Sequence, residues 1–126
     1  MRAVDTNVLV RLMMRDDPRQ VVAAARWAEE GVWVSTLALA ETVWVLAAVY
    51  DRRPPEIASA VEVLLGHKSL TLEDSDVVSA ALERFRERPS VSFSDCLLLE
   101  LARKAGHLPL GTFDRNLSKL PGTQRL

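Results

Sequence analysis

The chain has 126 residues, of which 48% are hydrophobic and 26% charged, a balance typical of globular proteins. Its formal net charge of −1 excludes a strong basic field over the whole surface, so any nucleic-acid site has to be local. The single cysteine, Cys96, excludes an internal disulfide and a cysteine-based zinc site. Because the sequence has neither a recognisable signal peptide nor an apolar run long enough to span a bilayer, we expect one domain over residues 1–126 of a cytoplasmic protein.

Short apolar segments alternate with longer segments of helical periodicity along the whole chain. Strands are predicted from the N-terminus to Asp5 and at residues 32–34, 69–72 and 107–111, with an edge strand in the tail at 120–126. Helices are predicted over residues 6–14, 18–30, 36–50, 54–65, 75–87 and 92–105. Helices between consecutive strands imply parallel pairing through right-handed crossovers. The expected fold is therefore a three-layer α/β/α sandwich around a small, mainly parallel sheet.

Asp5 stands where the first short strand gives way to a helix. The apolar side chains at residues 8, 9, 12 and 13 recur at helical spacing and predict one buried helix face directly after it. Aspartate is a favoured helix N-cap, which gives Asp5 a purely structural interpretation. In open α/β sheets, however, the carboxyl ends of the strands are also where ligands bind. Asp5 is therefore either a cap or the first member of an acidic site.

Three further acids have the same double interpretation. Glu41 is the only charged side chain in residues 36–50, and its helical neighbours are apolar, so on that face it needs an ionic partner, a metal ion or a proton. Its structural interpretation is a glutamate that extends to the edge of the helix or meets a buried arginine. Asp95 lies in the first turn of its helix, where it complements the helix dipole and resembles part of a capping box with Ser92. Asp114 follows the strand at 107–111 and suits a cap of the short turn after it.

Four carboxylates that met at one edge of the sheet would repel one another strongly. At about 5 Å and an effective dielectric constant near 20, each pair repels by roughly 3 kcal/mol. Several such pairs would rival the whole stability of a domain, about 5–15 kcal/mol. Such a cluster needs protons or a divalent cation, and oxygen ligands without cysteine or clustered histidine favour Mg²⁺ or Mn²⁺ over zinc.

The sequence resembles PIN-domain nucleases, specifically the VapC-like toxins of bacterial type II toxin–antitoxin pairs. The resemblance covers nearly the whole chain and rests on four segments in the family's order and spacing: residues 4–10, 39–46, 94–102 and 112–117. It implies a PIN-like sheet with acids converging at its carboxyl edge, and it assigns the family's acidic positions to Asp5, Glu41, Asp95 and Asp114. Asn7 and Thr112 match the polar residues that orient these acids.

The implied activity is metal-dependent, hydrolytic cleavage of single-stranded RNA that leaves a 5′-phosphate and a 3′-hydroxyl. We expect Asp5 and Asp95 to be direct ligands, and Asp114 and Glu41 to complete a second metal position or to orient water. The resemblance also implies a homodimer and a small antitoxin whose segment blocks the acidic groove with an arginine. Basic residues near the four segments are candidates for phosphate contacts, although solvated surface charge is the better explanation for any one of them: Arg11, Arg15, Arg52, Arg53, Arg115 and Lys119.

Two alternatives stay open at this point. The first is a PIN-like module that binds RNA or protein without cleaving it, although four acids have little purpose without a metal ion. The second is a phosphatase of the haloacid dehalogenase type, because residues 5–9 look like its nucleophile motif. In that motif a second aspartate usually stands where this chain has Asn7, and asparagine cannot donate the proton. The three tryptophans, which have apolar neighbours, are interpreted as core or dimer contacts rather than as base-stacking platforms: Trp27, Trp33 and Trp44.

Overall fold

The computed structural model describes residues 1–126 as two compact units, Met1–Ser75 and Asp76–Leu126. Six helices alternate with short strands, and every strand pair is parallel. The predicted α/β class with a small parallel sheet is therefore confirmed. No helix combines the length and the apolar character that crossing a membrane requires.

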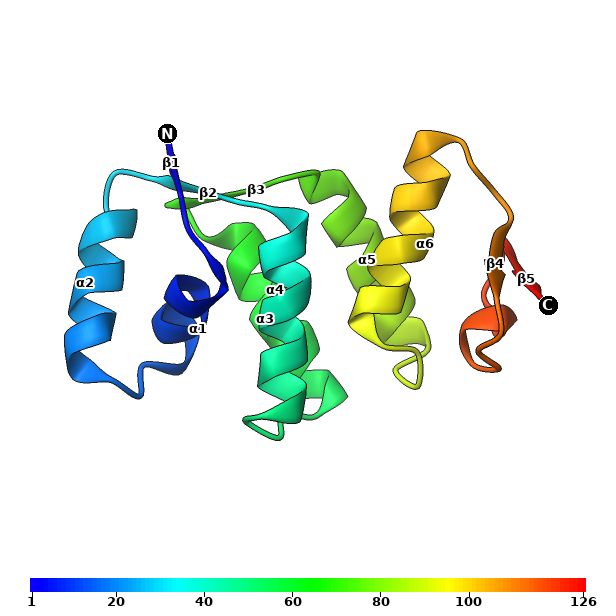
Figure 1. Ribbon diagram of the computed structural model, residues 1–126, viewed down its shortest axis with the longest axis horizontal. Helices are drawn as coiled ribbons and strands as arrows, with labels where there is room; N and C mark the ends of the chain where they lie inside the picture. The colour runs from blue at the N-terminus through cyan, green and yellow to red at the C-terminus, as the bar shows by residue number, and fades with distance from the viewer. The chain divides into compact units, whose positions relative to one another are not determined.

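The first unit contains a three-stranded sheet and four helices. The strands lie in the order β1-β2-β3, with Ala3 opposite Trp33 and Trp33 opposite Thr71. Figure 1 shows the four helices on the same side of these strands, as expected when two successive right-handed crossovers run in one direction. In chain order the elements are β1 (Arg2–Ala3), α1 (Thr6–Met14), α2 (Pro18–Ala28), β2 (Val32–Val34), α3 (Thr36–Ala48), α4 (Pro54–Gly66) and β3 (Leu70–Leu72).

Local sequence signals fix where the helices of the first unit begin. The side chains of Asp5, Asp17 and Ser35 accept hydrogen bonds from the backbone N–H groups three residues further on, and so cap α1, α2 and α3. Pro18 occupies the first turn of α2, where its missing N–H costs nothing. These three helices therefore begin directly after their capping residues.

The second unit contains two helices and a separate two-stranded sheet. The helices are α5 (Ser75–Glu87), whose first residue closes the first unit, and α6 (Phe93–Ala105). The strand β4 (Leu110–Thr112) pairs with β5 (Thr123–Arg125), and the short 3₁₀ helix η1 (Leu117–Lys119) lies between them. The predicted edge strand in the tail therefore forms, whereas the strand predicted at 107–111 begins three residues later and ends at Thr112.

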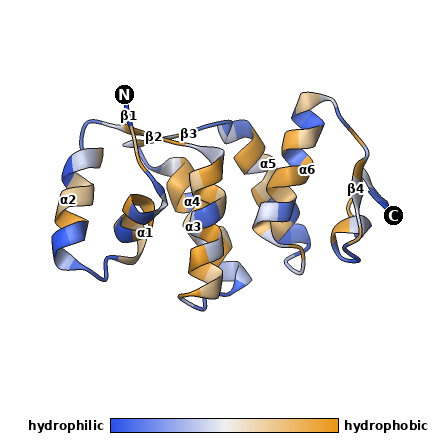
Figure 2. Ribbon diagram, in the orientation of Figure 1, coloured by the Kyte–Doolittle hydropathy of each residue, from blue (hydrophilic) through white to orange (hydrophobic).

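Each unit has its own buried apolar residues. In the first, Leu9 and Val61 are fully buried, and Figure 2 shows that α3 and α4 are hydrophobic along most of their length. In the second, the rings of Phe85 and Phe93 meet edge to face, with centroids 5.9 Å apart and an interplanar angle of 82°. Cys96 is also fully buried.

The interpretation of the three tryptophans as core residues is wrong, whereas their interpretation as dimer contacts stays a prediction. Trp27 is 42% exposed, Trp33 38% and Trp44 64%. Trp33 alternates along β2 with Val32 and Val34, so these valines take the buried face of the sheet and the indole takes the other. Apolar neighbours in sequence therefore did not reveal which face of an element is covered.

Candidate functional site

Asp5 follows β1 by two residues and caps α1. Its Oδ1 accepts a hydrogen bond of 3.0 Å from the backbone N–H of Val8, so the predicted capping role is real. The other carboxylate oxygen has no hydrogen-bond partner, and the side chain is exposed. A cap thus uses one oxygen of Asp5 and leaves the second available to a ligand at the carboxyl end of the sheet.

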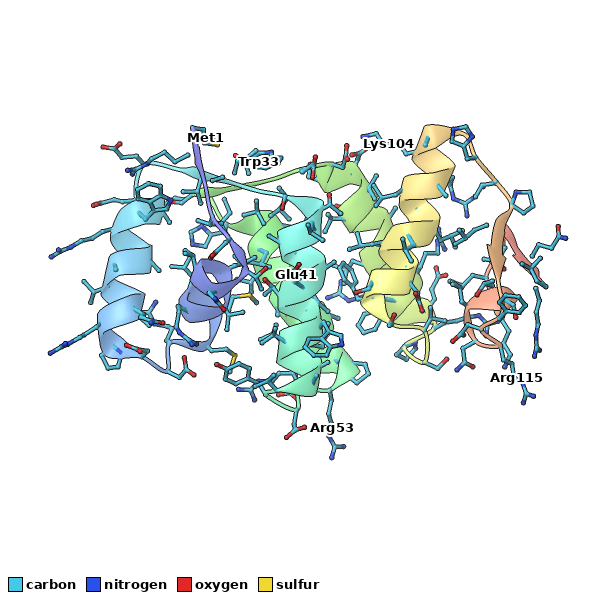
Figure 3. All side chains as sticks on the ribbon, viewed as in Figure 1. Met1, Trp33, Glu41, Arg53, Lys104 and Arg115 are labelled. Atoms are coloured by element: carbon cyan, nitrogen blue, oxygen red, sulfur yellow. The ribbon has the colours of Figure 1, made fainter.

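Glu41 is tied to the start of α1 through the residue next to Asp5. The hydroxyl of Thr6 donates a hydrogen bond of 2.8 Å to Glu41 Oε2, across 35 positions of sequence. This contact brings the second and third turns of α3, where Figure 3 labels Glu41, beside the first turn of α1. Sequence reasoning missed Thr6, because a threonine hydroxyl in a first helical turn carries no signal of a distant partner.

The environment of Glu41 differs from the prediction in one respect. The carboxylate was expected on an apolar helix face, where it would need a partner, but the structure leaves it exposed. Its helical neighbours Leu37 and Trp44 are also exposed, at 70% and 64%. Because the Glu41 carboxylate is exposed, water can solvate it without any partner in the protein. Its hydrogen bond with Thr6 therefore fixes its position and is not needed to compensate for burial.

Another acid at the same edge of the sheet has a structural role that the sequence did not reveal. Glu73 directly follows β3, and its Oε1 accepts a hydrogen bond of 2.9 Å from the backbone N–H of Thr36, at the start of α3. A carboxylate at a helix N-terminus is stabilised by the exposed N–H groups and by the helix dipole. Glu73 therefore fastens the end of β3 to the helix that carries Glu41.

Asp95 lies in the first turn of α6 in the second unit and is half-buried. Ser92 Oγ accepts from the backbone N–H of Asp95 at 3.1 Å, so the expected cap of α6 is present. The Asp95 carboxylate itself has no hydrogen-bond partner and does not return a bond to Ser92. Its charge also contributes, after burial, to raising the pKa of the neighbouring Cys96 thiol to about 12.

Asp114 follows β4 by two residues in the second unit. Thr112 Oγ1 accepts from the backbone N–H of Asp114 at 2.9 Å, and Asp114 Oδ1 accepts from the backbone N–H of Leu117 at 2.8 Å. Thr112 therefore contacts the acid that it was predicted to orient. Asn7, the other predicted orienting residue, is exposed and makes no side-chain hydrogen bond.

None of the four acids forms an ion pair with a lysine or arginine. By contrast, Asp16, Glu56 and Glu100 all do. Each of the four keeps at least one carboxylate oxygen without a partner, and oxygen donors of this kind fit a hard divalent cation. Neither unit taken by itself gathers three or more histidine, cysteine, aspartate or glutamate side chains into a group that could hold a metal ion.

The six predicted phosphate contacts divide into paired and unpaired groups. Arg11 donates to Asp16, Gln20 and the Tyr50 hydroxyl, so it holds the turn between α1 and α2 together. Arg52 lies 3.6 Å from Glu56. The other four cations form no ion pair with an acid: Arg15, Arg53, Arg115 and Lys119. Figure 3 shows two of them, Arg53 and Arg115, extending away from the ribbon.

Parallel strands followed by acids with unpaired oxygens define an α/β protein whose polar site lies at the carboxyl ends of its strands. The PIN domain family model matches residues 2–122, which is nearly the whole chain and spans both units. The chain therefore belongs to the PIN domain family, whose members have a nuclease-type fold and are generally metal-dependent. No curated protein and no solved structure matched the chain significantly. Membership of this family removes the phosphatase alternative.

Proposed function

We propose that this PIN domain is a metal-dependent endoribonuclease and the toxin of a toxin–antitoxin pair. The observation that carries the proposal is the family match over residues 2–122, which includes all four segments with candidate acids. In this proposal the two units act as one domain, and Asp5, Glu41, Asp95 and Asp114 share one cation site. The unpaired oxygen on each of these carboxylates supports that assignment.

The chain's own residues would prepare the site before any substrate binds. Asp5 and Asp114 are held rigidly, since one oxygen of each caps a helical turn while the other stays available. Thr6 fixes Glu41 by its hydroxyl, and Thr112 fixes the backbone of Asp114. Mg²⁺ or Mn²⁺, when bound, would supply charge neutralisation at the scissile phosphate and a water of lowered pKa.

RNA is the proposed substrate, and its phosphates would contact the unpaired cations Arg15, Arg53, Arg115 and Lys119. We further propose a homodimer and an antitoxin that inserts a cationic side chain among the acids. Such a partner would replace the metal ion as the source of positive charge. Size-exclusion chromatography with light scattering tests the dimer, and co-purification with the product of a small adjacent reading frame tests the antitoxin.

The chain offers a matched pair of variants that separates catalysis from helix capping. Asp5 and Asp17 both cap a helix through the backbone N–H three residues on, at 3.0 and 3.1 Å. Asparagine caps about as well as aspartate, so Asp5→Asn and Asp17→Asn should both leave stability within about 0.5 kcal/mol. Only Asp5→Asn removes a proposed ligand, and we expect it to reduce metal-dependent RNA cleavage by at least roughly 100-fold.

The assay is cleavage of labelled single-stranded RNA in Mg²⁺ or Mn²⁺, with EDTA as the metal-free control. Calorimetric titration of the two variants with Mn²⁺ gives a second measurement that does not depend on turnover. If Asp5→Asn cleaves as fast as the wild type, the assignment of the site is wrong. If the wild type neither binds a divalent cation nor cleaves RNA, the chain is a binding module, the remaining alternative.

A further inference from the structure

A pocket of about 310 Å³ opens in the first unit beside Asp5. It lies between the start of α1 and the middle of α2, and the chain contributes aromatic, apolar and amide groups to its lining. Ligand pockets usually measure about 300–1,000 Å³, so this one has the size for a single small ring system. The lining residues are Asp5, Asn7, Val8, Arg11, Gln20, Ala23, Ala24 and Trp27.

The polar groups of this pocket have unused hydrogen-bonding capacity. The Asn7 side chain makes no hydrogen bond, and it therefore offers both a donor and an acceptor. Gln20 accepts a hydrogen bond from Arg11 Nε through Oε1, which leaves its NH₂ group free to donate. Side-chain amides of this kind pair with the edges of nucleobases, which present donors and acceptors side by side.

Trp27 supplies an aromatic wall whose position is fixed before a ligand binds. Its Nε1–H donates to the carbonyl oxygen of Ala3 at 2.9 Å, and the guanidinium carbon of Arg2 lies 3.8 Å from the ring centroid. The indole nevertheless remains 42% exposed. Because the Arg2 guanidinium covers one face of the ring, a base in single-stranded nucleic acid would stack on the other face.

We propose that this pocket binds the nucleobase of a nucleotide adjacent to the cleaved phosphate. The inference rests on the proposed function for the place of that phosphate, since Asp5 belongs both to the proposed cation site and to the pocket lining. A base in the pocket would contact the apolar wall of Val8 and Ala24 and the amides of Asn7 and Gln20. The pocket would therefore contribute to the choice of cleavage site along an RNA.

The helix α2 offers a variant that fills the pocket and a control for it. Ala23 lines this pocket, whereas Ala25, two residues along the same helix, lines a different pocket of about 410 Å³. Both alanines are exposed, so Ala23→Leu and Ala25→Leu should fold equally well. Neither substitution replaces a proposed metal ligand.

The experiment compares an RNA that the wild type cleaves with copies that lack one base at each position flanking the cleaved bond. At one of these positions we expect base removal to lower kcat/KM by about 5- to 150-fold, the range that base–aromatic stacking supplies. Ala23→Leu should lower kcat/KM for the intact RNA, so that intact and abasic RNA are cleaved with equal kcat/KM. Ala25→Leu should retain the wild-type difference in kcat/KM between the two RNAs. Equal cleavage of all the RNAs by the wild type would overturn the inference.

A binding measurement separates this inference from the proposed nuclease activity. Replacing Trp33 and Trp44 by Phe leaves Trp27 as the only tryptophan, and circular dichroism checks that the variant folds. Without metal ion, we expect single-stranded oligoadenylate to quench its fluorescence and an abasic oligomer of equal length not to. Quenching by oligoadenylate, together with no cleavage of RNA in the separate assay with Mg²⁺ or Mn²⁺, would refute the nuclease activity and support the base-binding site. Cleavage with neither quenching nor base dependence would refute only the base site.

Discussion

Glu100 is the only acid in the chain that is buried, and its environment gives a quantitative prediction about stability. Its side chain is 5% exposed, with Arg103 Nε 2.9 Å from Oε2 and Arg84 Nε 3.4 Å from Oε1. We predict that replacing both arginines by methionine, which keeps the apolar stems, leaves an uncompensated buried charge. Adding Glu100→Leu to that variant should then restore most of the lost stability.

The expected magnitude follows from the cost of breaking a buried ion pair, about 3–5 kcal/mol. The side chains of Arg84 and Arg103 are 33% and 43% exposed, so solvent already screens part of the interaction and the lower end of that range applies. A loss of about 3 kcal/mol lowers the melting temperature of a domain of this size by on the order of 10 °C. Replacing a buried ion pair and its partners by apolar groups is often neutral, which predicts the recovery with Glu100→Leu.

The assay is urea unfolding of three proteins: the wild type, the double arginine variant and the triple variant. Arg103 also donates to the carbonyl oxygen of Pro121, and Arg84 to Glu87, but both contacts are missing from the double and the triple variant alike. The comparison of those two variants therefore isolates the charge of Glu100. If the triple variant is no more stable than the double variant, the unpaired charge is not the cause of the loss and the reasoning is refuted.

Three further predictions concern single groups. Thr6→Val removes the hydroxyl that holds Glu41 and should weaken Mn²⁺ binding roughly 10-fold, whereas Thr6→Ser keeps a hydroxyl and should bind as the wild type does. Equal Mn²⁺ affinities of the wild type and Thr6→Val in calorimetry would exclude a positioning role for Thr6. Burial raises the pKa of Cys96 to about 12, so at pH 8 we expect iodoacetamide to label the thiol only in unfolded protein; rapid labelling of native protein would contradict its burial. The hydrogen bond from the Tyr50 hydroxyl lowers the pKa of Asp16 below its ordinary value of 3.8. The stability that this hydrogen bond gives the folded protein is therefore complete above pH 3.8 and is lost as the pH falls through the lowered pKa. The stability difference between wild type and Tyr50→Phe should therefore shrink in acid, and a difference that grows there would refute the assignment.

The sequence by itself determined the elements, because their signals are local. Asp5, Asp17, Ser35 and Ser92 each cap a helix through a backbone group only three residues away, so spacing alone locates these bonds. The alternation of strands and helices likewise determined the parallel α/β class, and the family match confirmed the resemblance of the acidic segments to a PIN domain. The candidate acids were therefore recognisable from the chain, together with the capping roles of Asp5 and Asp114.

Only the tertiary structure decided which distant side chains meet and which faces are covered. Thr6 and Glu41 are 35 positions apart, and Arg84 and Glu100 are 16 apart, so these contacts depend on how elements pack rather than on spacing. The exposure of Trp27 is a tertiary property too, since its neighbours in sequence are the same whether or not another element covers the indole. Hydrogen bonds of a cap are fixed by one turn of backbone, whereas packing contacts are fixed by the whole fold, and this difference separates what the sequence revealed from what it left open.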